Sequence, residues 1–220
     1  MTVAKQRDHA NPRPAVTPVV IAVLRAADAR RYAPVVDVLA DNGIRGIELT
    51  MSTPGTLDVL ADIRAGIPDE VQVGIGTVTT VAQLNEALGV GVDFVVTPTT
   101  DVAVIDAAVT AGVPIYPGGL TPTELWKGWA AGATAVKVFP AALVGPDYVA
   151  HLRGPFPDIE VIPSGGVGMA EAVEWIRAGA CAVSVGGPLI GDALSGGDLD
   201  ALARRCRKLN DTVAAAEAHR

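Results

Sequence analysis

The chain alternates between short apolar runs and longer segments in which apolar residues recur every three or four positions. The short runs are typical of buried parallel strands, and the longer segments predict helices that cover them. The predicted strands cover residues 19–24, 45–50, 71–78, 92–98, 113–118, 133–141, 159–166 and 180–187. Helices are predicted over residues 29–42, 54–65, 81–88, 102–111, 170–178 and 199–218, after the capping-box pair Thr121 and Glu124, and from about Pro146.

Eight strand-then-helix units follow one another without a break in composition. Because each parallel crossover needs a covering helix, they predict an α/β fold, a (β/α)8 TIM barrel, as a single domain over residues 19–220. An open doubly wound sheet is the alternative, but its Gly-x-Gly-x-x-Gly fingerprint is missing after the first strand, where the chain reads LRAADARR. Residues 1–18 are polar and punctuated by proline, and we expect an N-terminal tail or helix there.

Composition narrows the range of functions. The 220 residues carry a formal net charge of −7, which disfavours nucleic acid as a partner because phosphate backbones are bound by surplus Lys and Arg. Two cysteines and three histidines suit neither a disulfide framework nor a metal cluster, so we expect no metal and no cofactor. The chain shows no signal-peptide pattern and no membrane-spanning apolar run. We therefore expect a cytoplasmic protein that acts on a small molecule.

One charged residue interrupts an apolar strand. In ATAVKVFPA, residues 133–141, Lys137 shares a face with Ala135 and Phe139, whereas the other three lysines lie in polar segments. Desolvation lowers the pKa of lysine side chains in general, and a partly neutral amine can attack a carbonyl. The alternative is a structural lysine that is paired with a buried carboxylate.

Glu48 is the candidate partner of Lys137. It lies in the second strand between Ile47 and Leu49, which strand alternation assigns to the helix-facing side, so Glu48 is predicted to face the barrel interior. Glu48 and Lys137 both come from even-numbered strands and can share a layer of that interior. A carboxylate there can move the protons that amine addition to a ketone requires, or it can merely neutralise the lysine.

Glycine-rich turns follow the last two strands, at the end of the barrel where active sites lie. Ser164, Gly165 and Gly166 follow the seventh strand, and Gly186 and Gly187 follow the eighth. Such turns expose backbone N–H groups where these barrels often hold a phosphate, although they also occur as simple tight turns.

Two polar residues at other strand ends complete the candidate site. Arg25 continues the inward-facing set of Ile21 and Val23, and its guanidinium can grip a carboxylate or form an ordinary loop ion pair. Thr77, on the parity of Val73 and Ile75, offers a hydroxyl group.

Several motifs occur together in one order: IAVLR (21–25), GIELT (46–50), GIGTV (74–78), VTP (96–98), TPTEL (121–125), KVFPA (137–141), GPFP (154–157) and PSGGV (163–167). At these residues the chain resembles the 2-keto-3-deoxy-6-phosphogluconate (KDPG) aldolase family, which includes 4-hydroxy-2-oxoglutarate (KHG) and 2-dehydro-3-deoxy-6-phosphogalactonate aldolases. The resemblance runs from about residue 19 to residue 215. It implies a barrel that assembles as a homotrimer and catalyses reversible aldol cleavage that releases pyruvate.

The resemblance also implies roles for individual residues. Lys137 matches the Schiff-base lysine of a class I aldolase, and Glu48 matches the general acid/base. The positions that match substrate-binding residues are Arg25 and Thr77 at the pyruvate carboxylate, Pro98 and Phe139 in the pocket wall, and Gly165, Gly166, Gly186 and Gly187 at the phosphate. The implied reaction cleaves a 2-keto-3-deoxy-6-phospho sugar acid to pyruvate and glyceraldehyde 3-phosphate.

Two positions depart from the family pattern. Ser52 stands where many members carry an arginine that helps to hold the keto-acid carboxylate, which leaves Arg25 as the candidate for that charge. Pro188 follows the last glycine pair where some members carry serine, and proline removes a backbone donor. Besides KHG and phosphogalactonate aldolases, two other functions stay open: an isomerase or epimerase in which Lys137 only stabilises an enolate, and a non-catalytic sugar-phosphate sensor.

Overall fold

A computed structural model describes residues 17–218 of the chain. The prediction of a tail or helix over residues 1–18 therefore falls almost wholly outside the described residues. From Thr17 onward, strands and helices alternate along the chain in the predicted order.

The longer strands come first in the chain: β1 (Val20–Leu24), β2 (Gly46–Thr50) and β3 (Gln72–Gly76). The others are β4 (Val95–Val96), β5 (Ile115–Tyr116), β6 (Gly118–Gly119), β7 (Val136–Val138), β8 (Val161–Pro163) and β9 (Val183–Val185). Every predicted strand run contains at least one of them. The fifth run is divided at Pro117, where the chain changes partner: β5 pairs with β4, and β6 pairs with β7.

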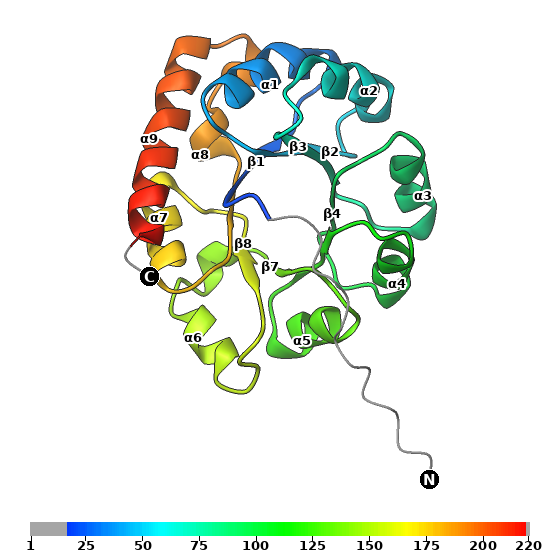
Figure 1. The fold of residues 1–220 in the computed structure, drawn as a ribbon, viewed down its shortest axis with the longest axis vertical. Coiled ribbons are helices and arrows are strands. Elements are labelled where there is room, and N and C mark those ends of the chain that lie inside the picture. Colours follow the sequence, from blue (N-terminus) through cyan, green and yellow to red (C-terminus); the bar gives the residue numbers. More distant parts are fainter. Residues whose placement is uncertain (1–16, 219–220) are drawn as a thin grey trace.

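Within residues 17–218 the strands form two parallel ladders. One has the order β5-β4-β3-β2-β1-β9, and the other has the order β6-β7-β8. They meet at Pro117 and again where Ser164, just after β8, forms an isolated parallel bridge with Ser184 of β9. Figure 1 shows the strands at the centre and the helices around the outside. The prediction of an α/β fold with parallel strands is confirmed.

The helices agree closely with the predicted ranges. They are α1 (Tyr32–Asp41), α2 (Thr56–Gly66), α3 (Val81–Gly89), α4 (Val102–Thr110), α5 (Pro122–Ala130), α6 (Tyr148–Arg153), α7 (Met169–Arg177) and α9 (Leu199–Glu217). A 3-10 turn, η1 (Ala29–Arg31), opens the first predicted helix. The short helix α8 (Gly187–Ile190) and the 3-10 turns η2 (Ala141–Leu143) and η3 (Ala193–Ser195) were not predicted.

The predicted capping box is present at the start of α5. The hydroxyl of Thr121 accepts a hydrogen bond from the backbone N–H of Glu124, and the Glu124 carboxylate accepts one from the backbone N–H of Thr121. Among the described residues, no helix is both long and apolar enough to cross a membrane.

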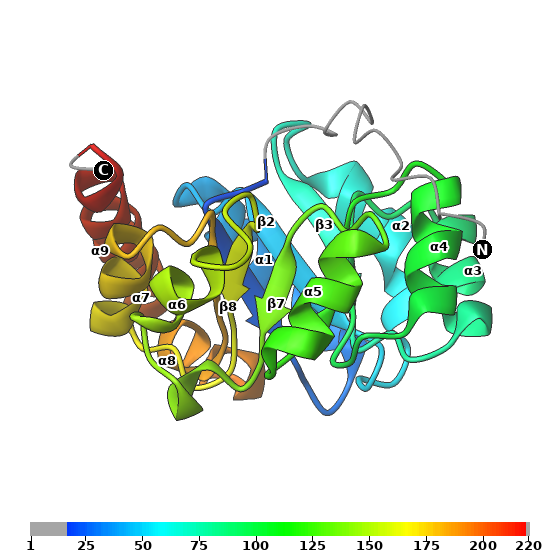
Figure 2. The ribbon, with the colours of Figure 1, turned by 90° about the horizontal axis from the view of Figure 1, so that it is seen from below.

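Strand alternation divides the buried apolar side chains into two clusters. The larger one lies between strands and helices, and it includes Ile47 and Leu49. The smaller one, which we call the inner cluster, draws on both ladders and contains Ile21, Phe94, Val96, Tyr116, Ala135, Ile162 and Ala182. Side chains from both ladders therefore pack together in this cluster. Figure 2 shows the two groups of strands from the side, with the helices outside them.

Glycine makes room for an aromatic ring of the inner cluster. A Cβ atom at Gly74 of β3 would lie 2.2 Å from ring atoms of Phe94, so a side chain at this position and the present ring position exclude each other. The Phe94 ring also packs at a tilt on Tyr116, with 5.5 Å between the ring centroids.

Candidate active site

Lys137 occupies the centre of β7. Its neighbours Val136 and Val138 pack in the larger cluster, while Lys137 lies on the face that Ala135 shares with the inner cluster. The residue is buried, with 8% of its surface exposed. Its backbone is held in both directions, because β7 pairs with β6 on one side and with β8 on the other. The strand alternation predicted from sequence is therefore the one that the structure adopts.

Glu48 lies on the inner face of β2. Ile47 and Leu49 pack in the larger cluster, as predicted, and only 2% of Glu48 is exposed. Its Oε1 lies against Gly76 of β3, and its Oε2 is buried without a hydrogen-bond partner among the described residues. Burial raises the pKa of this carboxyl group, and the positive charges of Lys137 and Arg25 partly oppose that shift.

Glu48 and Lys137 influence one another without a direct contact. The ion pairs of 4.0 Å or less among residues 17–218 all involve other residues. No ion pair of 4.0 Å or less therefore joins Glu48 and Lys137 in the described part of the chain. The lysine Nζ instead lies 4.9 Å from the centroid of the Phe139 ring, a distance at which a cation–π attraction operates.

Arg25 and Thr77 lie together at the ends of β1 and β3. Arg25 Nη2 donates a hydrogen bond of 3.4 Å to Thr77 Oγ1. Thr77 has a φ of 62°, which is rare for a β-branched residue. Parity along β3 would place Thr77 with Val73 and Ile75 in the larger cluster. The left-handed backbone breaks this alternation and brings the hydroxyl within reach of Arg25.

Hydrogen bonds connect the loops after β1 and β2. The buried Thr53 accepts a hydrogen bond of 3.0 Å from the backbone N–H of Ala26, and the Ala29 N–H donates to the Pro54 carbonyl at 3.1 Å. Ser52, which departs from the family pattern, is exposed between these contacts. Sequence reasoning missed Thr53, although a threonine one residue beyond Ser52 was a visible signal. The bonds hold the loop that carries Arg25 beside the end of the Glu48 strand.

The two predicted wall residues lie in the segments that follow β7 and β4. Phe139 follows β7 and is 38% exposed, and a Cβ at Gly165 would lie 2.9 Å from its ring. Pro98 follows β4, and its carbonyl oxygen would lie 2.6 Å from a Cβ at Gly118, which pairs with Lys137 in the ladder. The Phe139 ring thus lies beside the lysine, and Pro98 lies beside Gly118, the ladder partner of the lysine.

The two glycine turns occupy neighbouring strand ends. Gly165 and Gly166 have φ angles of 82° and 77°, a region that favours glycine. Ser164 Oγ donates a hydrogen bond of 3.3 Å to Ser184 Oγ, which links the end of β8 to β9. The second turn follows β9, so both turns lie on the same side of the strands.

The second glycine turn opens α8. Gly186 is the N-cap of this helix, and Pro188 lies in its first turn. A residue in the first turn has no intrahelical acceptor for its N–H, so Pro188 costs the helix no hydrogen bond.

These features agree with comparisons to known proteins. Residues 15–205 match the model of a family described as KDPG and KHG aldolase. The chain belongs to this family. The resemblance predicted from the motifs is confirmed, and it places the chain among the aldolases, which are lyases.

Individual relatives support the same assignment. A probable 2-dehydro-3-deoxy-6-phosphogalactonate aldolase of Rhizobium meliloti is 32% identical over 189 residues, which cover 86% of this chain and 89% of the relative. A 2-dehydro-3-deoxy-phosphogluconate aldolase of Pseudoalteromonas atlantica is 35% identical over 158 residues, or 71% of this chain and 73% of the relative.

A solved structure is similar in fold. The KDPG aldolase of Legionella pneumophila, with pyruvate captured as a covalent carbinolamine, has a TM-score of 0.80 and is 25% identical; the match covers 87% of this chain and 94% of that one. Family membership favours an aldolase over the isomerase and the sensor that the sequence left open.

The buried Glu48 carboxyl gives this aldolase a specific pH dependence of stability. Because its pKa is higher in the folded than in the unfolded chain, stability is lost as the pH rises from the unfolded pKa through the folded one. The Glu48→Gln variant lacks this loss. We expect its free energy of unfolding, measured by urea denaturation, to increase relative to the parent as the pH rises above the ordinary pKa of a glutamate side chain. A pH-independent difference, or the same trend in the exposed control Glu86→Gln, would contradict the prediction.

The short helix α8 depends on a tertiary contact. Arg205 of α9 donates to the carbonyls of Leu189 at 2.6 Å and Ile190 at 2.9 Å. We expect Arg205→Met to lower the free energy of unfolding by about 1.5–3 kcal/mol, the range for hydrogen bonds that involve a charged group. Its neighbour Arg204 is exposed, and within residues 17–218 its ion pair is with Asp198, so Arg204→Met is the matched control and should cost less than about 1 kcal/mol. Equal losses in guanidinium denaturation would refute the anchoring role.

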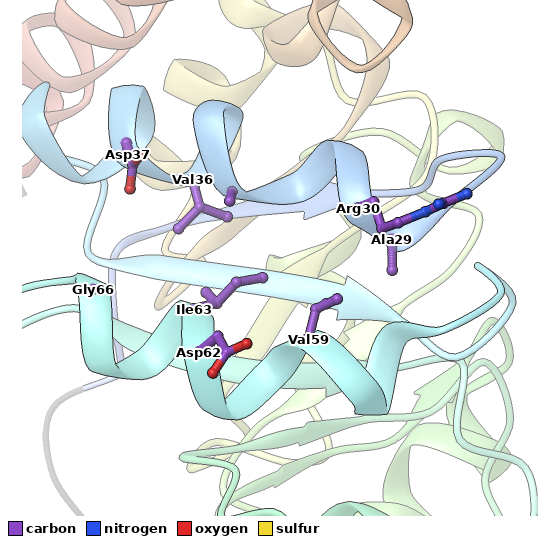
Figure 3. Close-up of a pocket in the computed structure, with 9 residues that line it drawn as sticks. Ala29, Arg30, Val36, Asp37, Val59, Asp62, Ile63 and Gly66 are labelled. Carbon is purple, nitrogen blue, oxygen red and sulfur yellow. The ribbon is translucent and has the colours of Figure 1, made fainter.

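A separate cavity of about 380 Å³ lies between α1 and α2 (Figure 3). Apolar side chains, among them Val36, Val59 and Ile63, point into it from both helices, and Asp37 and Asp62 lie at its sides. None of the predicted site residues lines it, and it offers no lysine for carbonyl chemistry. This cavity is therefore separate from the predicted site at the strand ends.

Proposed function

We propose that the chain is a class I aldolase that cleaves a 2-keto-3-deoxy-6-phospho sugar acid of the KDPG type to pyruvate and glyceraldehyde 3-phosphate. The observation that carries this proposal is the placement of Lys137 and Glu48, two buried ionisable side chains on the inner face of neighbouring ladders, without a direct ion pair. A neutral amine in such a position is a nucleophile for a ketone. The covalent carbinolamine captured in the Legionella pneumophila relative supports the same chemistry.

The proposed reaction starts with addition of the neutral Lys137 amine to the C2 carbonyl of the keto acid. The resulting carbinolamine loses water and becomes an iminium ion, with Glu48 transferring the protons. The iminium withdraws the electron pair of the C3–C4 bond while the C4 hydroxyl gives up its proton, and the aldehyde leaves. The remaining pyruvate enamine is protonated at C3, and hydrolysis of the iminium releases pyruvate and the free lysine.

Glu48 suits the acid/base role because of its environment. An acid/base group works best when its pKa lies near the working pH. Burial raises the pKa of the Glu48 carboxyl group above its ordinary value, which moves it toward the working pH. The unpartnered Oε2 is free to exchange a proton with a substrate oxygen, with the C3 carbon, or with an intervening water.

Arg25 and Thr77 are proposed to bind the substrate carboxylate. We expect Arg25→Met to raise the KM for the keto acid by roughly 10- to 100-fold, because a charge-assisted hydrogen bond contributes about 1.5–3 kcal/mol. The matched control is Arg30→Met, since Arg30 is exposed and pairs with Asp28 in the same loop region. Steady-state kinetics decide the matter: an unchanged KM in Arg25→Met would remove this residue from the carboxylate site.

The turns formed by Ser164, Gly165, Gly166, Gly186 and Gly187 are proposed to bind the substrate phosphate. Their neighbouring strand ends, linked through the Ser164–Ser184 contact, support this proposal. The experiment compares cleavage of KDPG, its galactonate isomer and unphosphorylated KHG, with pyruvate release as the readout. We expect the highest kcat/KM for KDPG. A preference for the galactonate isomer or for KHG would reassign the substrate within the family, and an absence of pyruvate would refute the aldolase proposal.

We also propose that the two ladders are parts of one closed (β/α)8 barrel, formed as a single domain over residues 19–220. The Ser164–Ser184 bridge and the shared inner cluster support closure. As the family resemblance implied, the proposed assembly is a homotrimer. From composition, we propose that it works in the cytoplasm without a metal or cofactor. Light scattering after gel filtration would test the trimer, and the mass of a single chain would refute it.

A further inference from the structure

The Glu48 side chain lies directly on the backbone of Gly76, the last residue of β3. A Cβ atom built at Gly76 would be 1.9 Å from Glu48 Oε1, 2.5 Å from Cδ and 2.7 Å from Cγ. Real Cβ atoms essentially never approach another heavy atom closer than 3.0 Å. Three consecutive atoms of the glutamate, Cγ, Cδ and Oε1, occupy the space that a side chain at residue 76 would fill. A side chain there would therefore displace the whole end of the Glu48 side chain, and not only its terminal oxygen.

Backbone conformation does not explain a glycine at this position. Gly76 is not among the residues with a positive φ, so a substituted residue could adopt the same backbone. Glycine inside a strand is also unfavourable, because it loses more conformational freedom on folding than other residues do. The carbonyl of Gly76 is bound by the Met51 N–H at 2.8 Å, which holds the strand end in place. The space that glycine leaves free is therefore its distinguishing property.

The same strand supplies an internal comparison. Gly74 lies on the same face two residues earlier, and the space above it is filled by the Phe94 ring. At Gly74 the missing side chain thus admits an apolar core residue, whereas at Gly76 it admits the only buried carboxylate among the described residues.

We propose that Gly76 is a positioning residue for the acid/base group: by lacking a side chain, it sets where the Glu48 carboxylate lies beneath the substrate. This inference rests on the proposed role of Glu48. A methyl group at position 76 must push the carboxylate away from β3, since the contacts of 1.9, 2.5 and 2.7 Å would each have to lengthen beyond 3.0 Å. Displacements of about 1 Å at a reacting group can cost roughly 100-fold in rate.

The experiment uses the full chain and the variants Gly76→Ala, Glu48→Ala and their combination. We expect Gly76→Ala to lower kcat by roughly 10- to 100-fold with little change in KM, and to shift the pH dependence of kcat, because the carboxyl moves to a different environment. In the Glu48→Ala background the added methyl enters vacated space, so the same substitution should change the residual kcat by less than about twofold. Gly89→Ala is the control, because a Cβ at Gly89 meets nothing within 4 Å.

Each outcome separates the inference from the proposed function. If Glu48→Ala alone keeps full activity, the acid/base role of Glu48 fails. If Glu48→Ala is inactive while Gly76→Ala keeps the parent kcat and pH profile, the positioning role of Gly76 fails. It also fails if Gly76→Ala lowers kcat by the same factor in the parent and in the Glu48→Ala variant. Should Gly76→Ala alone not fold, thermal denaturation of the double variant decides: recovery of a folded protein supports competition for one space, and an unfolded double variant overturns it.

Discussion

Replacement of Lys137 by methionine is expected to lower kcat for keto-acid cleavage by at least roughly 10⁴-fold, as happens when the nucleophile of a covalent mechanism is removed. Methionine fills a similar volume in the buried position between β6 and β8, so the strand should be retained. Treatment of the parent enzyme with pyruvate and borohydride should add irreversible mass at Lys137, and the variant should show none. Pyruvate release in a coupled assay and peptide mass spectrometry give the two readouts.

Two further variants make the Lys137 test specific. Lys137→Arg keeps a positive charge at the site but offers no primary amine that can form an imine with the keto acid, and we expect the same loss of activity. Lys127→Met removes an exposed lysine on α5 and should leave kcat unchanged. An active Lys137→Arg enzyme would mean that the site needs the charge and not the nucleophile, and a parent enzyme that stays active and unlabelled would exclude the Schiff base.

Glu48→Gln is expected to lower kcat by roughly 10²- to 10⁴-fold, the usual contribution of a positioned acid/base group. Glutamine keeps the shape of the side chain above Gly76 but can no longer exchange the proton. The variant should still bind the keto acid, because the proposed carboxylate ligands Arg25 and Thr77 are intact. We expect the pH dependence that the carboxyl group imposes on kcat to disappear as well.

The control for this variant is Glu86→Gln, an exposed glutamate on α3 with no role in the site. Stopped-flow measurement of carbinolamine and enamine formation with pyruvate would show which proton transfers are slowed. A Glu48→Gln enzyme with a kcat within about tenfold of the parent would transfer the acid/base role to another group.

The order of strands and helices was predictable because periodicity is a local property of the chain. Lengths were less predictable: the run over residues 92–98 forms only the two-residue strand β4, since pairing depends on its neighbours. The helix α8 is too short to show a period, and its last carbonyls are bound by Arg205, far along the chain. Tertiary contacts thus account for what the local pattern missed.

In the candidate site, too, local patterns were predictable from the sequence and tertiary contacts were not. Alternation along single strands was sufficient to place Glu48 and Lys137 on the inner face. Parity alone does not explain the position of the Thr77 hydroxyl beside Arg25, because a positive φ at Thr77 breaks the alternation beyond the strand end. The space above Gly76 depends on the alignment of β2 with β3, which pairs Thr50 with Gly76, and one strand alone does not contain that information.

The packing of Phe94 over Gly74 has a consequence for how this chain can change. The two positions share one volume, because any side chain at residue 74 would overlap the present ring. Loss of the ring alone would leave an empty space beside Tyr116, which is costly in a close-packed interior. Relatives and engineered variants are therefore expected to exchange bulk between these two positions in concert, a larger residue at one accompanying a smaller residue at the other.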